Sequence, residues 1–425
     1  MAVCGKRQFE LLEKMGFVRI SGTPEESKAA QILIDEIATL GLKAEHVPFE
    51  VDDGTVELAK FAVLEPEYKE YTVTGYKLAK NTAEGGEDYD FMYLEQFNDV
   101  MLAEVKDKVV LVNGRMTADN YKKLIEAGAA GFITMGGTVI DEVEKTDLDT
   151  RTLRSTLSEH GLMPAFHIRM IDALEILKSG ATRVHIELHT TATKHTSHNV
   201  YVEVPGTTKP EEIVDFGAHY DSVEFSPGVW DNAAGCVTIM EILRHFVEHP
   251  PVRTCRFIFF GSEELGLNGS KAYVASIPEE ELPKHVFMVN ADVGGSVLGA
   301  NSVSCTSDEG LCKYVEYMAR EVGYSTSVRQ SIMSSDSVPF ADRGIPAINF
   351  ARGGGPGMQG MGFMHTRYDM ISLISPEALA VVTEFAVALS ERMVNAKIFP
   401  VPRTIPKNIR EDLDKYLAKK PEEKK

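Results

Sequence analysis

Hydrophobic positions in the second half of the chain follow two alternating spacings. Short apolar runs of strand length are followed by stretches in which apolar residues recur every three or four positions. The strand-like runs are residues 200–204, 213–216, 255–260, 286–289 and 345–350, and the helix-like stretches are residues 233–247, 310–322 and 376–394. Strands that alternate with helices predict an α/β fold with a doubly wound, mixed and mostly parallel sheet.

The N-terminal part predicts a helix with a well-defined start. Thr23 can cap it, Pro24 suits the first helical position, and Glu26 can close a capping box. Apolar residues then recur at helical spacing until Gly41 ends the helix. Residues 42–51 follow as a strand that leads away from this helix.

Between residues 54 and 188 the pattern changes to short strand-like runs separated by polar turns. Residues 105–112, 121–128 and 129–133 predict a strand, a helix and a strand. A chain of 425 residues exceeds what one hydrophobic core usually serves, so a small β-rich domain inserted into the main one is expected. The expected parts are an N-terminal segment (1–53), the insert (54–188), the main domain (189–402) and a charged C-terminal tail (403–425).

Charge and composition narrow the function classes. The formal net charge of −19 argues against binding to nucleic acid or to an anionic membrane surface, both of which attract basic patches. No apolar run approaches the ~20 residues that span a bilayer. The first 17 residues mix charged with apolar positions, unlike a secretory signal, and the five cysteines are scattered and odd in number. A cytoplasmic protein is expected.

Five short segments place metal-binding side chains where predicted strands end. They are residues 218–221 (Ala-His-Tyr-Asp), 229–232 (Val-Trp-Asp-Asn), 261–264 (Gly-Ser-Glu-Glu), 290–292 (Asn-Ala-Asp) and 364–366 (Met-His-Thr). In a doubly wound sheet, ligands bind beyond the carboxyl ends of the strands. Two imidazoles, three aspartates and a glutamate pair are enough for two divalent ions that share a bridging carboxylate. The set therefore favours a metallohydrolase.

Taken singly, each segment also has an ordinary structural explanation. His219 could be a surface histidine, although Asp221 is placed to orient its imidazole. Asp231 could cap the following helix, a role that Asn232 can take instead. Glu263 and Glu264 could form a solvated turn; alternatively, one binds metal while its neighbour contacts a water. Asp292 and His365 could likewise belong to a turn and to a surface loop.

As a set, the motifs resemble those of the co-catalytic zinc aminopeptidases of clan MH, the family that contains secreted bacterial leucine aminopeptidases. The resemblance covers residues 198–390 and implies the zinc exopeptidase fold. It implies that His219 and Asp292 hold one zinc ion. Glu264 and His365 would hold the other, and Asp231 would bridge the two. Members of this family also carry protease-associated inserts, which residues 54–188 resemble.

The resemblance also implies a mechanism. Glu263 would act as the general base, with Asp221 as a supporting catalytic group. The expected enzyme is a di-zinc metallopeptidase that removes N-terminal residues from peptides, although Co²⁺ or Mn²⁺ would suit the same ligands. The expected partners are peptides with a free N-terminus, with no nucleic acid and no membrane, and a homo-oligomer stays open.

Other functions remain open at this stage. A carboxypeptidase on the same scaffold would need cations for a terminal carboxylate, and Arg343, Arg352 and Arg367 are candidates. A glutaminyl cyclase resembles the scaffold but uses a single zinc, and a receptor-like binding protein would be expected to lack ligands. Trp230 and the glycine-rich loop 353–362 are candidate pocket walls or plain packing.

Two further positions stay undecided. Asp336 stands where the family has a Ser-Asp-His stretch, here without the histidine, so it either supports the site or forms a turn. Residues 245–249 spell the His-x-x-Glu-His zinc signature directly before two prolines, where a solvated helix end is expected instead.

Overall fold

The computed structural model describes residues 3–114, 116–354, 363–417 and 419, and the chain forms two compact units. The first unit comprises Met1–Val51 and Thr196–Lys425, and the second comprises Asp52–His195. Two long strands, β1 (Glu45–Glu65) and β9 (Arg183–Val204), contain the points at which the chain passes from one unit to the other.

The first unit is built on a mixed sheet with the strand order β14-β13-β15-β12-β10-β11-β9. Its strands are β10 (Lys209–His219), β11 (Arg253–Phe260), β12 (His285–Ala291), β13 (Gly299–Cys305), β14 (Ser327–Gln330), β15 (Ala347–Gly354) and the C-terminal part of β9. The central strand β10 is parallel to both β11 and β12, whereas β9 and β13 run antiparallel to their neighbours β11 and β15. The predicted doubly wound, mostly parallel α/β sheet is confirmed.

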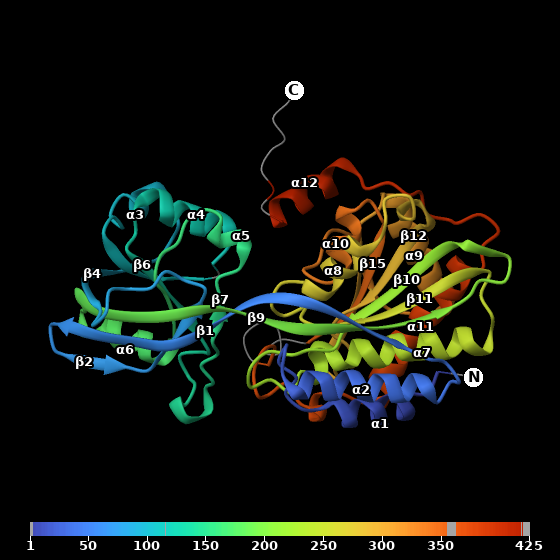
Figure 1. Cartoon of the computed structure of the whole chain (residues 1–425), viewed down its shortest axis with the longest axis horizontal. Coiled ribbons are helices and arrows are strands. Elements are labelled where there is room, and N and C mark those ends of the chain that lie inside the picture. Colours follow the sequence, from blue (N-terminus) through green and yellow to red (C-terminus); the bar gives the residue numbers. More distant parts are fainter. Residues whose placement is uncertain (1–2, 115, 355–362, 418, 420–425) are drawn as a thin grey trace. The chain divides into compact units, whose positions relative to one another are not determined.

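Helices cover both faces of this sheet (Figure 1). They are α1 (Gly5–Met15), α2 (Pro24–Ala38), α7 (Ala234–Glu248), α8 (Asn268–Ser276), α9 (Glu309–Val322), α10 (Ser337–Asp342), α11 (Pro376–Val394) and α12 (Lys407–Tyr416), with short turns η2 (Val229–Ala233), η3 (Leu282–Lys284) and η4 (Ile371–Leu373). The helices expected near residues 233–247, 310–322 and 376–394 are therefore confirmed as α7, α9 and α11.

Side chains of β11 alternate between the two cores, as the pleat of a strand requires. Phe257 and Phe259 belong to the larger core, to which α1, α2, α7, α9 and α11 contribute. Ile258 and Phe260 belong to a smaller core on the other face, which contains Val274 of α8. Because both faces are covered, the strands are largely apolar, and the buried polar side chains within them, such as Asp215 in β10 and Asn349 in β15, are hydrogen-bonded.

The stretch expected as a charged C-terminal tail, residues 403–425, contains the helix α12. Ile409 and Leu413, four residues apart, are buried in a small cluster with Leu267, Val338 and Ala341. Charged residues occupy other positions of the helix, so an amphipathic helix lies within a sequence whose composition suggested a tail. Residues 418 and 420–425 of the expected tail lie outside the described residues.

The second unit has its own core and its own sheet, with the order β9-β4-β5-β6-β8-β3-β7. Its elements are β2 (Lys69–Tyr71), β3 (Val73–Lys77), β4 (Glu87–Leu94), α3 (Asp99–Leu102), β5 (Lys108–Val112), α4 (Ala118–Ala127), β6 (Gly131–Gly136), η1 (Val143–Lys145), β7 (Arg151–Thr152), α5 (Ser155–Ser158), β8 (Ala165–Arg169) and α6 (Met170–Ser179). The predicted strand-helix-strand segment is present as β5, α4 and β6.

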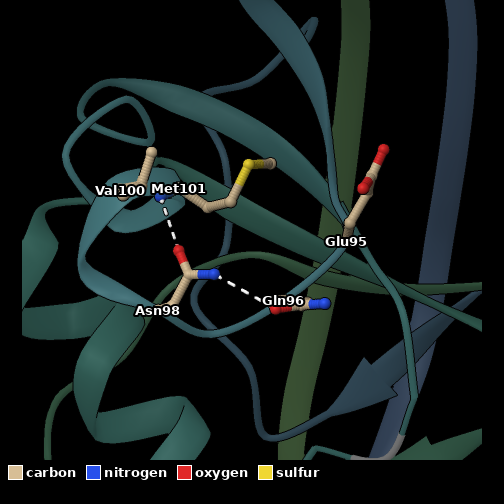
Figure 2. A pocket seen from close by; sticks show the side chains of 5 residues that line it. All are labelled: Glu95, Gln96, Asn98, Val100 and Met101. Atoms are coloured by element: carbon tan, nitrogen blue, oxygen red, sulfur yellow. Dashed lines mark hydrogen bonds between the residues drawn. The ribbon is translucent and has the colours of Figure 1, made fainter.

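A shallow pocket of about 290 Å³ opens in the second unit, beside α3 (Figure 2). It is lined by Glu95, Gln96, Asn98, Val100 and Met101. The Asn98 side chain accepts a hydrogen bond from the Met101 N–H (3.0 Å) and donates one to Gln96 Oε1 (3.2 Å). The polar groups of this pocket thus serve mainly to cap α3.

In the described part of the chain, no helix has both the length and the apolar character needed to cross a membrane.

Gly217, in the middle of β10, tests how tightly the sheet is packed. A Cβ atom there would lie 2.3 Å from Cε2 of Phe260 and 3.0 Å from Cε of Met288. We expect G217A to lower the free energy of unfolding by about 1–3 kcal/mol, the usual cost of overpacking a core. Urea unfolding measures this. The control is G353A in β15, where the nearest atom to the added Cβ is 4.0 Å away; equal stability of the two variants would contradict the packing described.

Candidate metal centre

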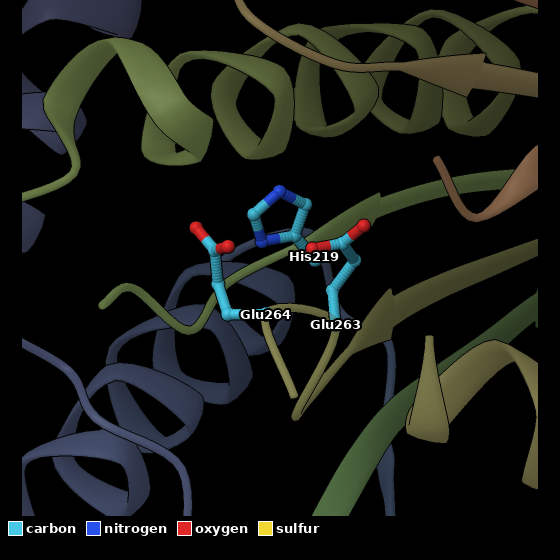
Figure 3. Close-up of side chains that lie close together, drawn as sticks. All are labelled: His219, Glu263 and Glu264. Atoms are coloured by element: carbon cyan, nitrogen blue, oxygen red, sulfur yellow. The ribbon is translucent and has the colours of Figure 1, made fainter. Parts of the chain in front are cut away.

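The site lies at the edge of the first unit's sheet where the parallel strands end. His219 is the last residue of β10 and is paired in register with Phe260, the last residue of β11. The turn after β11 carries Glu263 and Glu264, whose side chains rise on either side of the His219 ring (Figure 3). Metal-binding atoms of these three residues lie within 4.8 Å of one another. The register of the strands thus places side chains from separate segments at one point.

All five predicted ligands meet at this point, around Asp231. His219 Nε2 lies 3.2 Å from Asp231 Oδ1 and 3.6 Å from Asp292 Oδ1. On the other side, His365 Nε2 lies 3.3 Å from Asp231 Oδ2 and 3.2 Å from Glu264 Oε2. Each carboxylate oxygen of Asp231 therefore faces a different imidazole. The five residues form two groups of three that share Asp231.

The centre is buried and rich in negative charge. His219, Asp231 and Asp292 are 1%, 7% and 5% exposed, so little solvent screens their charges. Burial raises the pKa of Glu263 well above its ordinary value, and the charge of Glu264 adds to this while His219 opposes it. Burial also raises the pKa of Asp292. Two imidazoles cannot balance this many carboxylates, and bound cations would.

Asp221 holds the backbone of the glutamate turn. One of its carboxylate oxygens accepts a hydrogen bond from the Glu263 N–H (3.0 Å), and the other accepts one from the Glu264 N–H (3.1 Å). Its Oδ1 also lies 3.4 Å from Nδ1 of His219. Asp221 is fully buried. It therefore faces the imidazole as expected from the sequence, and in addition fixes two residues of the neighbouring segment.

Asn232 connects the segments that carry Asp231 and Asp292. Its side-chain oxygen accepts hydrogen bonds from the N–H groups of Gly235 (2.9 Å) and Val293 (3.2 Å). Its amide donates to the carbonyl of Ala291 (2.9 Å). Asn232, and not Asp231, thus satisfies the start of α7, which leaves the Asp231 carboxylate free to face the imidazoles.

Asp369, in the motif His-Thr-x-x-Asp, fixes the backbone on the other side of Asp231. It accepts hydrogen bonds from the N–H groups of Trp230 (2.7 Å) and Asp231 (3.0 Å). Trp230 itself is 2% exposed, belongs to the larger core and donates its indole N–H to the carbonyl of Arg352 (2.9 Å). Of the two roles considered for Trp230, structural packing is the one observed.

Arg19, which nothing in the sequence singled out, is a fully buried arginine behind the site. Its guanidinium donates to the carbonyls of Tyr220 (2.6 Å) and Gly228 (2.9 Å), and also to that of Pro227. These carbonyls belong to the loop between His219 and Asp231. Burial lowers the pKa of Arg19. The negative charges of the surrounding carboxylates act in the opposite direction, and Asp221 has the largest effect among them.

Three residues of the site adopt a left-handed backbone conformation although none is a glycine. They are Ser262 (φ 55°), Val293 (φ 58°) and His365 (φ 62°). Each such residue costs on the order of 1 kcal/mol or more, and the surrounding structure must supply this energy. All three belong to or adjoin the proposed ligand segments, as is typical of functional sites.

Other sequence candidates lie elsewhere or remain near the edge of the centre. His245 and His249 stack on each other at the end of α7, and they appear in none of the metal-binding groups found among the described residues. Asp336 is fully buried at the start of α10, and burial raises its pKa to about 7. Residues 355–362 of the loop proposed as a pocket wall lie outside the described residues.

The fold and the residues at the sheet edge define a metal-dependent hydrolase scaffold. Residues 199–390 match peptidase family M28. Over 413 residues, the chain is 29% identical to aminopeptidase YwaD of Bacillus subtilis strain 168, an alignment that covers 94% of this chain and 86% of that protein. The chain is an enzyme that is similar to peptidase family M28 over residues 199–390, which confirms the resemblance noted in its motifs.

Two further comparisons support this assignment. The structure of BSAP, a zinc aminopeptidase from Bacillus subtilis, matches with a TM-score of 0.75 at 26% identity and covers 96% of this chain and 98% of that one. A probable leucine aminopeptidase 2 of Arthroderma benhamiae is 26% identical over 273 residues, which is 58% of this chain and 54% of that protein.

Asn232 offers a stability test of the site's framework. The substitution N232A removes three buried hydrogen bonds and leaves two N–H groups and a carbonyl without them, so we expect a loss of about 2–4 kcal/mol in the free energy of unfolding. Chemical denaturation of the metal-free protein measures it. N98A is the control because Asn98 also caps a helix but is exposed; a typical exposed cap is worth about 1 kcal/mol. A similar loss in both variants would contradict the bridging role of Asn232.

Proposed function

We propose that the protein is a metal-dependent aminopeptidase that uses two zinc ions. His219 and Asp292 would bind one ion, Glu264 and His365 the other, and Asp231 would bridge them. One observation carries the proposal: the two groups of three metal-binding residues share Asp231, and each of its oxygens faces one imidazole. Histidine nitrogen mixed with carboxylate oxygen is a donor set that suits zinc.

When bound, zinc would polarise the scissile carbonyl and lower the pKa of a coordinated water toward ~7. The chain's own contribution to the reaction is proton transfer by Glu263. Its carboxylate would accept the proton of the attacking water and return it to the leaving amine. Without bound metal, burial and the charge of Glu264 raise the pKa of Glu263, and the charge of bound zinc would favour the ionised carboxylate that accepts a proton. Its backbone N–H is held by Asp221, so the base has a fixed position.

Carboxylates that surround the centre favour a substrate's ammonium group over a terminal carboxylate. Two of the three arginines considered for a carboxypeptidase are engaged elsewhere. Arg343 pairs with Glu279 (2.8 Å), and Arg352 donates to the carbonyl of Ser296 (2.7 Å) and to Asn301 Oδ1 (2.8 Å). Their contacts support aminopeptidase over carboxypeptidase action.

The other two candidate functions, a glutaminyl cyclase and a receptor-like binding protein, also fit the site less well than a di-zinc aminopeptidase. A glutaminyl cyclase with one zinc would need only one of the two groups of ligands. A receptor-like protein without catalysis would not need a buried glutamate beside the ligands. Relatives named as aminopeptidases add support for peptide substrates with a free N-terminus.

We also propose that the second unit is a protease-associated insert of the peptidase. The strand-helix-strand segment β5, α4 and β6 supports this, as does the position of the unit between two parts of the peptidase chain.

Metal removal is the first test of the proposed activity. We expect the protein to release nitroaniline from aminoacyl-nitroanilides with a free amino group and not from their N-acetylated forms. A chelator should abolish the reaction and added zinc should restore it, because the ligands alone provide no Lewis acid. Trimming of peptides from the carboxyl end, with no release from the free-amine substrates, would instead show a carboxypeptidase.

Replacement of the proposed base is a sharper test. E263Q keeps the shape of the side chain but cannot accept a proton, so kcat should fall by about 10²–10⁴-fold. Zinc content, measured by elemental analysis, should stay at the wild-type level because Glu263 is not one of the five proposed ligands. E280Q, at an exposed position, serves as the control and should retain full activity. Wild-type turnover by E263Q would refute the proposed role of Glu263.

A further inference from the structure

Glu26, in the first turn of α2, is a buried acid whose contacts lead to the metal centre. It is 2% exposed. Its Oε2 accepts a hydrogen bond from the Gly22 N–H (2.7 Å), and its Oε1 accepts one from the hydroxyl of Ser197 on β9 (2.6 Å). The backbone N–H of Ser262 also faces this carboxylate and opposes the rise of its pKa. Ser262 directly precedes Glu263, so Glu26 contacts the turn that carries the proposed base.

These contacts differ from the capping box expected from the sequence. The Glu26 N–H does bond to Thr23 Oγ1 (3.3 Å), which is one half of such a box. The other half would be a bond from the Thr23 N–H to the Glu26 carboxylate. Instead, the Thr23 N–H donates to the carbonyl of Ile20 (3.1 Å), and the carboxylate extends to Gly22, Ser197 and Ser262. The side chain is thus used mainly outside its own helix.

The chain passes very close to Glu26 where β11 ends. A Cβ atom on Gly261 would lie 2.9 Å from Oε1 of Glu26 and 2.4 Å from Oγ of Ser197. Only a glycine allows the backbone this close to the carboxylate. The next residue, Ser262, has a φ of 55°, a conformation that is costly for a residue with a side chain. The attraction between its N–H and the buried carboxylate that it faces opposes this cost.

Two acids therefore face the backbone of the same turn. Asp221 accepts hydrogen bonds from the N–H groups of Glu263 and Glu264, and Glu26 lies against Gly261 and faces the N–H of Ser262. Both acids are buried, and the pKa of Glu26 is raised to about 7, first by burial and then by the charge of Asp221. Two neighbouring buried acids are an unfavourable arrangement for stability alone. Their shared target is the backbone that positions Glu263 and Glu264.

We propose that Glu26 is a positioning residue that fixes the Ser262–Glu264 backbone so that Glu263 faces the bound substrate. The proposal rests on the proposed function of Glu263 as the general base. It makes the N-terminal helix α2 part of the support of a site whose ligands all come from residues 219–365. Glu26 itself touches neither the metal ligands nor the substrate.

The test uses E26Q in the full-length, zinc-loaded protein. The amide keeps the shape of the carboxylate but loses its charge and offers one accepting oxygen in place of two, so the Gly22 N–H and the Ser197 hydroxyl can no longer each bond to an oxygen of their own. E25Q is the matched control, because Glu25 lies in the same helical turn and is exposed. Hydrogen exchange of the amides of residues 262–264 reports on the turn directly and does not depend on catalysis. Zinc content, kcat and KM are measured on the same samples.

We expect exchange at residues 262–264 to become roughly tenfold faster in E26Q, because the side chain that faces this turn loses its negative charge. Amides of β12 should exchange as in the wild type. The kcat should fall about tenfold with KM and zinc content unchanged, because misplacement of a catalytic group slows the chemical step. E25Q should match the wild type in every measurement.

The outcomes separate this proposal from the proposed function. Unchanged exchange at residues 262–264, or exchange that increases equally across the sheet, would overturn the positioning role. Faster local exchange with wild-type kcat would also overturn it, since the turn would then not matter for catalysis. If E26Q shows the local increase but E263Q retains wild-type turnover, Glu26 still fixes the turn and the assignment of the base fails instead.

Discussion

Mutual repulsion among buried carboxylates is the constraint around which the peptidase unit is organised. Six acids lie at or near the end of the sheet: Asp221, Asp231, Glu263, Glu264, Asp292 and Asp336. Among the described residues, the metal-binding groups here contain two imidazoles, those of His219 and His365. Charges of one sign in a poorly screened interior repel strongly, and removing them from water carries a further cost. Burial accordingly raises the pKa of Glu263, Asp292 and Asp336.

Such a cluster persists only if the backbone that carries it is held from outside. Several ligand-bearing segments are held by buried anchors. Asp369 accepts hydrogen bonds from the N–H groups of Trp230 and Asp231. Asn232 bonds both to Gly235 at the start of α7 and to Ala291 at the end of β12, and so connects these two elements. Arg19 donates hydrogen bonds to backbone carbonyls of the loop between His219 and Asp231. Asn232 also accepts the hydrogen bond of the Val293 N–H and so supports the left-handed conformation of that residue.

Three ligands, His219, Glu264 and Asp292, could be predicted from the sequence because each follows an apolar strand of recognisable length. Parallel strands end at one edge of the sheet, so these three side chains were expected to meet there. Asp231 and His365 follow loops and were recognised through the set of motifs. The anchor Arg19 carries no local signal of either kind. Arg19 follows an unremarkable helix, and its five acceptors are backbone carbonyls of Met15, Phe17, Tyr220, Pro227 and Gly228, which no sequence pattern reveals. The helix α12 was missed for another reason: its buried residues, Ile409 and Leu413, are outnumbered by charges.

The anchors also explain why the peptidase unit extends beyond the part of the chain that matches the family. The match covers residues 199–390, whereas Arg19 and Glu26 lie far upstream. Their partners lie on the other side of the second unit in sequence, so these contacts close a very long loop. The entropy cost of closing a loop grows only with the logarithm of its length, by about 0.6 kcal/mol for each doubling. A separately folded unit can therefore stand between residues 51 and 196 while the N-terminal helices still support the metal centre.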